Sequence, residues 1–345
     1  MAVVNNNTSF DKQVYYRLVA LWAVVEAFLG GMIHGLKLPV SGLVVGSGAV
    51  LCICLIAWYV PVKGAILKAT VIVAVCKMML SPQSPPPAYV AVFFQGLIGE
   101  LLFFNKKYFR TACLLLGALA LFESAVQRVL VMTIIYGKNL WLVIDEFISN
   151  LTHQKEVTSY SIVLVGCYIL MHTIVGMMVG FYAGKIVKRS QQWGLLHKDW
   201  LIPTPVENTD TAIVEKTVRK PNKIRLGLFI AWVVLIILFL QSWAEIGNPI
   251  LPRQAVVQIL FRSFLIVLSW YFLISPLVML LLKKWLTKQQ QKSQADIREV
   301  LLLLPSARHL IQQSWQLSHG SKGFRRVATC CKIILMNTLQ KPNEP

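Results

Sequence analysis

Long apolar stretches alternate with short polar ones along most of the chain. A helix needs about 20 mainly apolar residues to cross a bilayer, and eight stretches approach that length. They cover residues 14–35, 40–60, 62–80, 87–104, 110–136, 159–184, 225–243 and 255–282. The pattern predicts an all-α, polytopic membrane protein with about eight transmembrane helices, arranged as a bundle of six followed by two more.

The apolar pattern is interrupted once by a long polar segment, which extends over about residues 185–224 and contains three prolines. Such a segment is typical of a linker. It divides the chain into a six-helix membrane domain at 1–190, a cytoplasmic linker at 191–224, and a C-terminal block at 225–345 with two membrane helices and a tail.

The charge distribution predicts how the chain is oriented in the membrane. Only 14% of the residues are charged, yet the net charge is +19. If the N-terminus is cytoplasmic, four of the 34 lysines and arginines fall in external loops, namely Lys37, Lys138, Lys155 and Arg253. This is the bias of the positive-inside rule, so we expect both termini in the cytoplasm and no nucleic-acid partner.

Ionisable residues inside the expected spans are candidates for a functional site, because charges are costly in a bilayer. Glu26 falls near the middle of the first span, and Glu100 falls nearer the cytoplasmic side. On the expected topology several polar groups converge on the external half of the bundle, where they predict a ligand pocket: His34, Lys77, Gln95, Glu123, Gln127 and Arg128. The alternative interpretation is a set of hydrogen bonds and ion pairs between helices.

Two external loops are suited to enclosing such a pocket. Residues 81–89, SPQSPPPAY, are rich in proline and therefore stiff, which favours a lid or a wall. The loop at 136–156 has an apolar core around Trp141–Ile148, which predicts a short interfacial helix or a cap.

Small residues four apart allow helix backbones to approach closely in a membrane. Gly176, Gly180 and Gly184 fall on one face of the sixth span, where they indicate packing within this protein. Ala23 and Ala27 fall on one face of the first span, and we expect them to face a partner subunit.

The C-terminal tail contains two amphipathic segments. Residues 295–318 carry a helical apolar stripe that we expect to be broken at Pro305, and a glycine break near 320–323 precedes a second helix. Amphipathic helices with basic residues lie along a bilayer surface or dock on a partner.

No catalytic constellation is evident in the sequence. The chain has no GxxxxGK[ST] phosphate loop and no HExxH motif, its six histidines are isolated, and its seven cysteines have no metal-site or disulfide spacing. We therefore predict no enzyme activity, no cofactor and no metal site in this chain.

The first block resembles the substrate-binding S component of energy-coupling factor (ECF) transporters. The AVVEA sequence from Ala23 to Ala27 matches the AxxxA motif by which helix 1 of that family contacts the transmembrane T component. KLPVSGLVV at 37–45 and YVPVKGAILKA at 59–69 look like the regions around helices 2 and 3, and FQGLIGELLF at 94–103 looks like helix 4.

The C-terminal block is similar to a reduced T component. Residues 305–326, PSARHLIQQSWQLSHGSKGFRR, look like a cytoplasmic coupling helix that docks on ATPases. Gly320 matches the family's Ala-Arg-Gly motif, whereas Ser318 and His319 depart from it. The resemblance implies an ATPase contact at His319 and Gly320, to which Arg325 and Arg326 contribute charge.

The resemblance implies an uptake component of a bacterial plasma membrane. It would capture a small polar, vitamin-like nutrient outside the cell and work with separate ABC-type ATPase subunits, and the need for a separate T component beside the fused segment stays open. Two alternatives remain open on the residues alone: a membrane scaffold that recruits a cytoplasmic partner through its basic tail, and an integral membrane enzyme that acts on a lipid-linked substrate.

Overall fold

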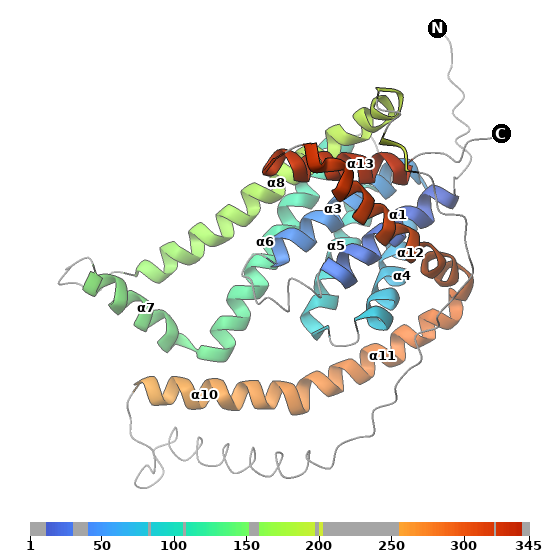
Figure 1. Cartoon of the computed structure of the whole chain (residues 1–345). Helices are drawn as coiled ribbons and strands as arrows, with labels where there is room; N and C mark the ends of the chain where they lie inside the picture. Colours follow the sequence, from blue (N-terminus) through green and yellow to red (C-terminus); the bar gives the residue numbers. More distant parts are fainter. Residues whose placement is uncertain are drawn as a thin grey trace. The chain divides into compact units, whose positions relative to one another are not determined.

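The computed structural model describes residues 12–29, 41–81, 84–105, 108–151, 159–196, 200–202, 255–320 and 322–339. All regular structure in these ranges is helical (Figure 1). The helices are α1 (Lys12–Val24), η1 (Val25–Leu29), α3 (Ser41–Tyr59), α4 (Ala65–Leu80), α5 (Pro86–Leu102), α6 (Phe109–Tyr136), α7 (Lys138–Leu151), α8 (Tyr160–Leu196), α10 (Ala255–Ser269), η4 (Trp270–Ile274), α11 (Ser275–Lys292), α12 (Gln294–Leu317), η5 (Ser318–Gly320) and α13 (Phe324–Leu339).

Four of the described helices are long and apolar enough to cross a membrane, at Gly42–Tyr59, Phe109–Tyr136, Tyr160–Val187 and Phe261–Lys292. The all-α prediction is confirmed at this level. Three other expected spans coincide with shorter described helices: α5 has 17 residues, α4 has 16, and α1 with η1 is described from Lys12 to Leu29. The expected span at 225–243 lies outside the described residues. The count of eight stays a prediction.

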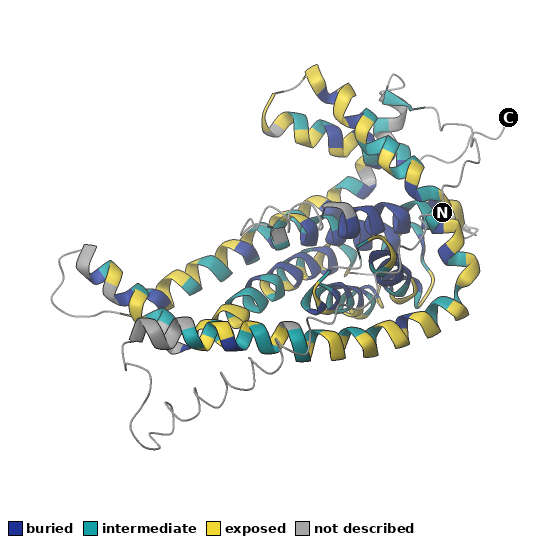
Figure 2. Ribbon diagram, turned by 60° about the horizontal axis from the view of Figure 1, so that its bottom comes forward, coloured by how far each residue is buried: buried dark blue, intermediate teal, exposed yellow. Residues whose placement is uncertain are grey.

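The chain forms two compact units, the first built from Met1–Ala125, Ile169–Pro205 and Leu282–Pro345. The C-terminal helices α12 and α13, together with the last residues of α11, therefore group with the N-terminal helices. Within this unit α1 packs against α3, α4, α12 and α13. Its helices form most of the buried core, which is dark blue in Figure 2.

Glycines allow helix α3 to pack closely against two other elements of the first unit. A Cβ atom on Gly48 would lie 2.6 Å from Val25 of η1, and one on Gly46 would lie 2.9 Å from Leu121 of α6. A side chain on Gly42 would overlap Ser124 of α6. The N-terminal half of α3 consequently lies close to Glu26 and to the middle of α6.

A second close contact joins α6 to α8. A Cβ atom on Gly117 would overlap the carbonyl of Gly176, and one on Gly176 would overlap the carbonyl of Gly117. A Cβ atom on Gly180 would overlap the carbonyl of Cys113. The prediction that the glycines of the sixth span serve packing within the chain is thus confirmed for Gly176 and Gly180.

The second unit comprises Val126–Tyr168 and Val206–Leu281. Its α7 confirms the helix predicted in the 136–156 loop.

The buried Asp145 carboxylate of α7 accepts hydrogen bonds from the backbone N–H (2.6 Å) and the hydroxyl (3.0 Å) of Ser161, which satisfies groups at the start of α8. The guanidinium of Arg262 lies against Gly137, which has φ +73° and ends α6.

The C-terminal helices differ from expectation at one residue. Pro305 lies inside α12 and does not break it. A proline removes one backbone hydrogen bond, but neighbouring Leu304 is buried and α12 packs along α1, so tertiary contacts maintain the helix. The expected glycine break is confirmed, because Gly323 has φ +58° immediately before α13.

Candidate functional site

A buried ion pair joins the end of α1 to α4. The Nζ atom of Lys77 lies 2.7 Å from Oε2 of Glu26, and the two side chains are 5% and 3% exposed. Glu26 lies in the π-helical turn η1 that continues α1, and such turns occur frequently at functional sites. A buried charge persists only when it is paired and hydrogen-bonded, so each residue requires the other.

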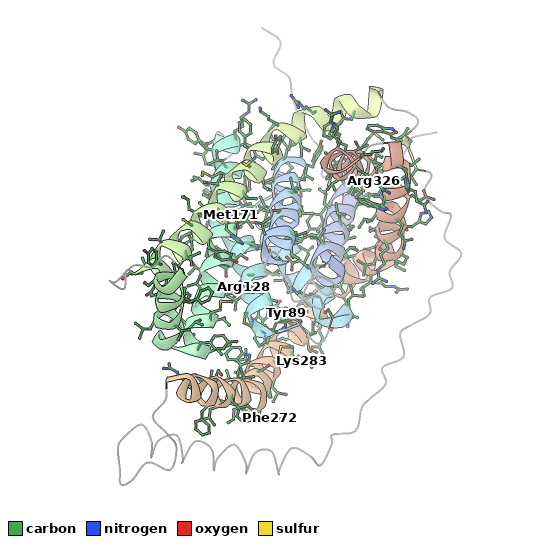
Figure 3. All side chains as sticks on the ribbon, turned by 60° about the vertical axis from the view of Figure 1, so that its left-hand side comes forward. Tyr89, Arg128, Met171, Phe272, Lys283 and Arg326 are labelled. Atoms are coloured by element: carbon green, nitrogen blue, oxygen red, sulfur yellow. The ribbon has the colours of Figure 1, made fainter. Side chains whose placement is uncertain are left out.

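The start of α5 completes the surroundings of Lys77. Its ammonium group donates a 3.4 Å hydrogen bond to the Ala88 carbonyl and lies 5.8 Å from the centre of the Tyr89 ring. Tyr89, labelled in Figure 3, is 1% exposed. Three segments that are distant in sequence, η1, α4 and α5, therefore meet at one charged group. We refer to Glu26, Lys77, Ala88 and Tyr89 as the Lys77 site.

Two buried aromatic residues, one on α1 and one in this site, carry polar atoms that have no hydrogen-bond partner in the described part of the chain. They are the indole Nε1 of Trp22, one helical turn before Glu26, and the hydroxyl of Tyr89. The same is true of Oε1 of Gln95 and Oε2 of Glu123. Such atoms are uncommon in folded proteins, and each asks for an explanation.

The expected ligand residues are distributed unevenly. Lys77 and Gln95 are buried in the first unit, and Gln95 Nε2 lies 3.6 Å from the position of a Cβ atom on Gly46. Glu123 is half-buried in the same unit. Gln127 and Arg128 belong to the second unit, where Arg128 interacts electrostatically with Tyr168. His34 lies outside the described residues.

Glu100 has a structural role. Its carboxylate accepts hydrogen bonds from the backbone N–H groups of Gly64 (2.6 Å), Ile66 (3.2 Å) and Leu67 (3.4 Å). These groups lie at the start of α4, where four N–H groups lack partners within the helix. Glu100 therefore caps α4 from α5, and the negative charge also suits the helix dipole.

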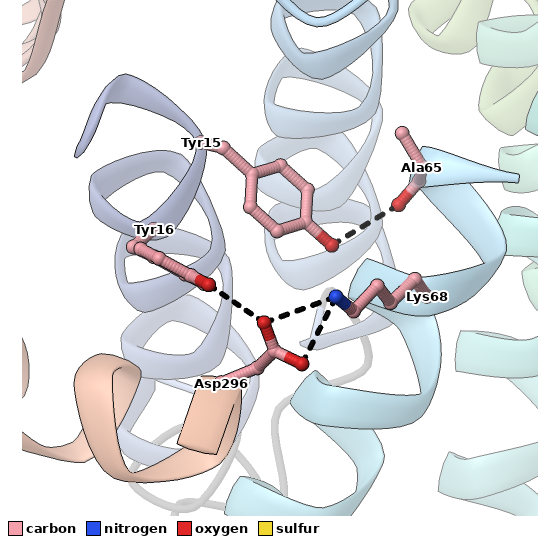
Figure 4. Close-up of polar contacts among 5 residues, drawn as sticks. All are labelled: Tyr15, Tyr16, Ala65, Lys68 and Asp296. Carbon is pink, nitrogen blue, oxygen red and sulfur yellow. Dashed lines mark hydrogen bonds and ion pairs between the residues drawn. The ribbon is translucent and has the colours of Figure 1, made fainter. Parts of the chain in front are cut away.

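A second polar junction joins α12 to the other ends of α1 and α4 (Figure 4). The Asp296 carboxylate accepts a 2.6 Å hydrogen bond from the Tyr16 hydroxyl and pairs with Lys68 at 2.9 Å. Beside it, the Tyr15 hydroxyl donates a 3.3 Å hydrogen bond to the Ala65 carbonyl. We call Tyr16, Lys68 and Asp296 the Asp296 junction.

The electrostatics of Asp296 favour its charged form. Burial alone would raise the pKa of its carboxyl group, but the hydrogen bonds from Tyr16 and Lys68 and the nearby positive charges of Lys68 and Lys12 outweigh burial. The pKa of Asp296 is therefore held below its ordinary value. The carboxylate consequently stays ionised at neutral pH and attracts Lys68.

The expected partner-contact residues are found in contrasting environments. Ala23 is fully buried and Ala27 is 7% exposed within the chain. His319 and Gly320 are exposed in η5, and Arg325 is exposed on α13. Arg326 stacks on the Trp315 ring, with Cζ 4.1 Å from its centre, and donates a 3.3 Å hydrogen bond to the Trp315 carbonyl. Figure 3 labels Arg326 on α13.

Several residues of these sites escaped the sequence analysis. Glu26 and Lys77 were both recognised as charges inside spans, but their pairing was not, because a contact over 51 positions has no periodic signal. Tyr16, Lys68 and Asp296 resembled ordinary polar residues near helix ends. The orphaned atoms of Trp22 and Tyr89 depend on packing alone.

Comparison of the chain with protein-family models, with curated proteins and with solved structures found no match. Within the described residues, no group of three or more His, Cys, Asp or Glu side chains is arranged to hold a metal ion.

Proposed function

We propose that this chain is the substrate-capturing membrane component of an ECF-type uptake system. In this proposal the Lys77 site binds a small polar nutrient, and α12 and α13 provide the cytoplasmic surface on which separate ATPase subunits act. The chain combines in one polypeptide a binding domain similar to an S component and a reduced segment similar to a T component.

One observation carries the proposal: α12 packs on the same two helices whose other ends form the Lys77 site. Asp296 of α12 contacts Tyr16 of α1 and Lys68 of α4. Glu26 of η1 and Lys77 of α4 pair about ten residues further along these helices. Helices α1 and α4 therefore run directly from the α12 contact to the candidate binding site, as a device that couples ligand binding to the cytoplasmic helices requires.

The environment of Ala23 and Ala27 also supports the proposal. In the family that the sequence resembles, helix 1 packs through its AxxxA motif on the T component. Here α12 and α13 of the same chain pack on α1, and both alanines are buried. This packing supports the proposal that the C-terminal helices serve, within one chain, the role beside helix 1 that the resemblance gives to a T component.

The test is purification of the full-length chain from its native membrane, with mass spectrometry of the bound proteins and small molecules. We expect a pair of ABC-type ATPases and a small polar molecule. Asp296→Arg places a positive charge beside Lys68, so it should weaken the α12 contact and reduce the recovery of ATPases while the small molecule is retained. Arg298→Glu, on the exposed side of α12, is the control for a charge change on that helix.

Two results would contradict the proposal. Recovery of some other stable partner, with neither ATPase nor small molecule, would favour a membrane scaffold. Conversion of a lipid-linked substrate by the purified chain, lost on changing Glu123, would favour an enzyme.

A further inference from the structure

The turn between α12 and α13 carries positive charge without any negative charge nearby in the sequence. Residues 300–343 include six lysines and arginines but no Asp or Glu. Lys322 precedes α13, and Arg325 and Arg326 lie in its first turn. Lys322 and Arg325 are exposed, and neither forms an ion pair within the described part of the chain. We refer to residues 315–320 and 322–327 as the α12–α13 turn.

The same turn exposes large apolar side chains. Trp315, Leu317 and Val327 are 46%, 49% and 50% exposed. The Arg326 guanidinium stacks on the Trp315 ring, so a cation and an aromatic surface are presented together. Tryptophan is enriched where a bilayer meets water, and arginine and lysine in the segments that adjoin the bilayer. The composition of the turn therefore suits the surface of a membrane.

Contacts with the end of α8 place α13 at about the height of the lipid headgroups. The Lys332 ammonium lies 5.7 Å from the centre of the Trp193 ring of α8. The Asn337 side chain forms two 2.9 Å hydrogen bonds with the backbone of residues 200–202. The membrane-length part of α8 ends at Val187, and Trp193 follows about 9 Å further along the helix. Headgroups extend about 5–8 Å beyond the hydrocarbon on each side, so α13 lies close to them.

We propose that the α12–α13 turn binds the anionic phospholipid headgroups of the leaflet at which α8 ends. Lys322, Arg325 and Arg326 pair with the lipid phosphates, and the exposed face of Trp315 lies among the headgroups. An acidic protein surface would offer the same charge, but α8 itself brings the bilayer to the height of this turn. The inference goes beyond the proposed uptake function and does not rest on it.

Reversal of one charge in the turn should weaken this contact. Each lysine or arginine near an anionic membrane surface strengthens the attraction about fivefold. Arg325→Glu replaces attraction by repulsion at an exposed side chain, so the fold should be retained. Arg298→Glu is the matched control, because it makes the same charge change at an exposed residue of α12 that lies about 25 Å along the helix from Trp315.

The experiment is amide hydrogen exchange of the purified full-length chain, without ATPases, in two kinds of nanodisc. One contains phosphatidylcholine alone, and the other also contains phosphatidylglycerol. Amides at the start of α13 should exchange about fivefold more slowly in the anionic discs, and high salt should reduce the difference because it screens surface charge. Arg325→Glu should lose most of the difference, whereas Arg298→Glu should keep it.

Two results would overturn the inference: equal exchange of the wild type in the two discs, or a difference that Arg325→Glu retains in full. The outcomes for the proposed function are separate. Protection of the turn by ATPase subunits, with no effect of lipid charge, would overturn the lipid contact and leave the uptake function standing. Protection by anionic lipid in a chain that recovers no ATPase would retain the lipid contact and overturn the uptake function.

Discussion

Helices α1 and α4 take part in two polar contacts that each contain a lysine–carboxylate pair, but in opposite surroundings. The Glu26–Lys77 pair is almost fully buried, whereas in the Asp296 junction the Lys68 side chain is 50% exposed. The ionic distances are similar, 2.7 and 2.9 Å. The difference shows that exposure to water, rather than distance, decides how much each pair matters for the fold.

Water weakens the Asp296 junction and also makes it easy to break. Exposed ion pairs contribute about 0–1 kcal/mol, and both partners are hydrated again when they separate. A buried pair cannot separate in this way, because each charge would be left in an apolar environment. The Lys77 site therefore fixes α1 against α4, while the Asp296 junction contributes little to holding α12, whose buried Ile297, Val300 and Leu304 provide most of that contact.

The largest effect is expected from Lys77→Met, which leaves the Glu26 carboxylate buried and unpaired. Removal of one partner of a buried ion pair costs about 3–5 kcal/mol. We expect a large loss of thermal stability, measured by circular dichroism in detergent. The Glu26→Gln/Lys77→Met variant removes both charges, so it should regain much of the lost stability. A double variant no more stable than Lys77→Met would show that the unpaired Glu26 charge is not the cause of the loss.

The next effect concerns the cap of α4, which lies near the Asp296 junction. Glu100→Ala removes the acceptor for three N–H groups at the start of the helix, so unfolding should become easier by about 1–2 kcal/mol. Glu100→Gln keeps one acceptor oxygen and should lose about half as much. Equal stability of Glu100→Ala and the wild type in the same thermal assay would contradict the capping role.

A smaller effect is expected at the Asp296 junction itself. Asp296→Asn keeps the size of the side chain but removes its charge, which should weaken α12 docking by about 1 kcal/mol or less. The change should appear as faster hydrogen exchange of α12 amides, with little change in α4 near Lys77. Tyr16→Phe removes only the hydroxyl donor and should have a similar, local effect. Faster exchange throughout the chain in either variant would contradict the contrast between the Lys77 site and the Asp296 junction.

The smallest effect is the pH dependence of the same contact. The pKa of Asp296 is lower in the folded chain than its ordinary value of about 4. The contribution of its carboxylate is therefore fully present above pH 4 and is lost as the pH falls through the folded pKa. Exchange of α12 amides, corrected for the intrinsic rate, should be constant between pH 7 and 5 and should rise below pH 4, and Asp296→Asn should abolish that rise.

The helices were more predictable from the sequence than the contacts between them. Apolar stretches of about 20 residues located α3, α6 and α8, and the apolar core at Trp141–Ile148 located α7. The prediction failed at Pro305, where packing of α12 along α1 outweighs the local cost of a proline. The sequence predicted part of the candidate site, because Lys77 and Gln95 are polar residues inside expected spans. Trp22 and Tyr89 could not be told apart from other aromatic residues of the spans.

The sequence by itself determined that this chain is helical, that several of its helices have membrane length, and that charges are buried among them, because these properties follow from composition and period. Only the tertiary structure decided that Glu26 pairs with Lys77, that Glu100 caps α4, and that Asp296 fastens α12 to α1 and α4. The physical reason is that a charge buried in an apolar bundle must find a partner in space. That partner is selected by how the helices pack, over separations at which the sequence has no periodicity.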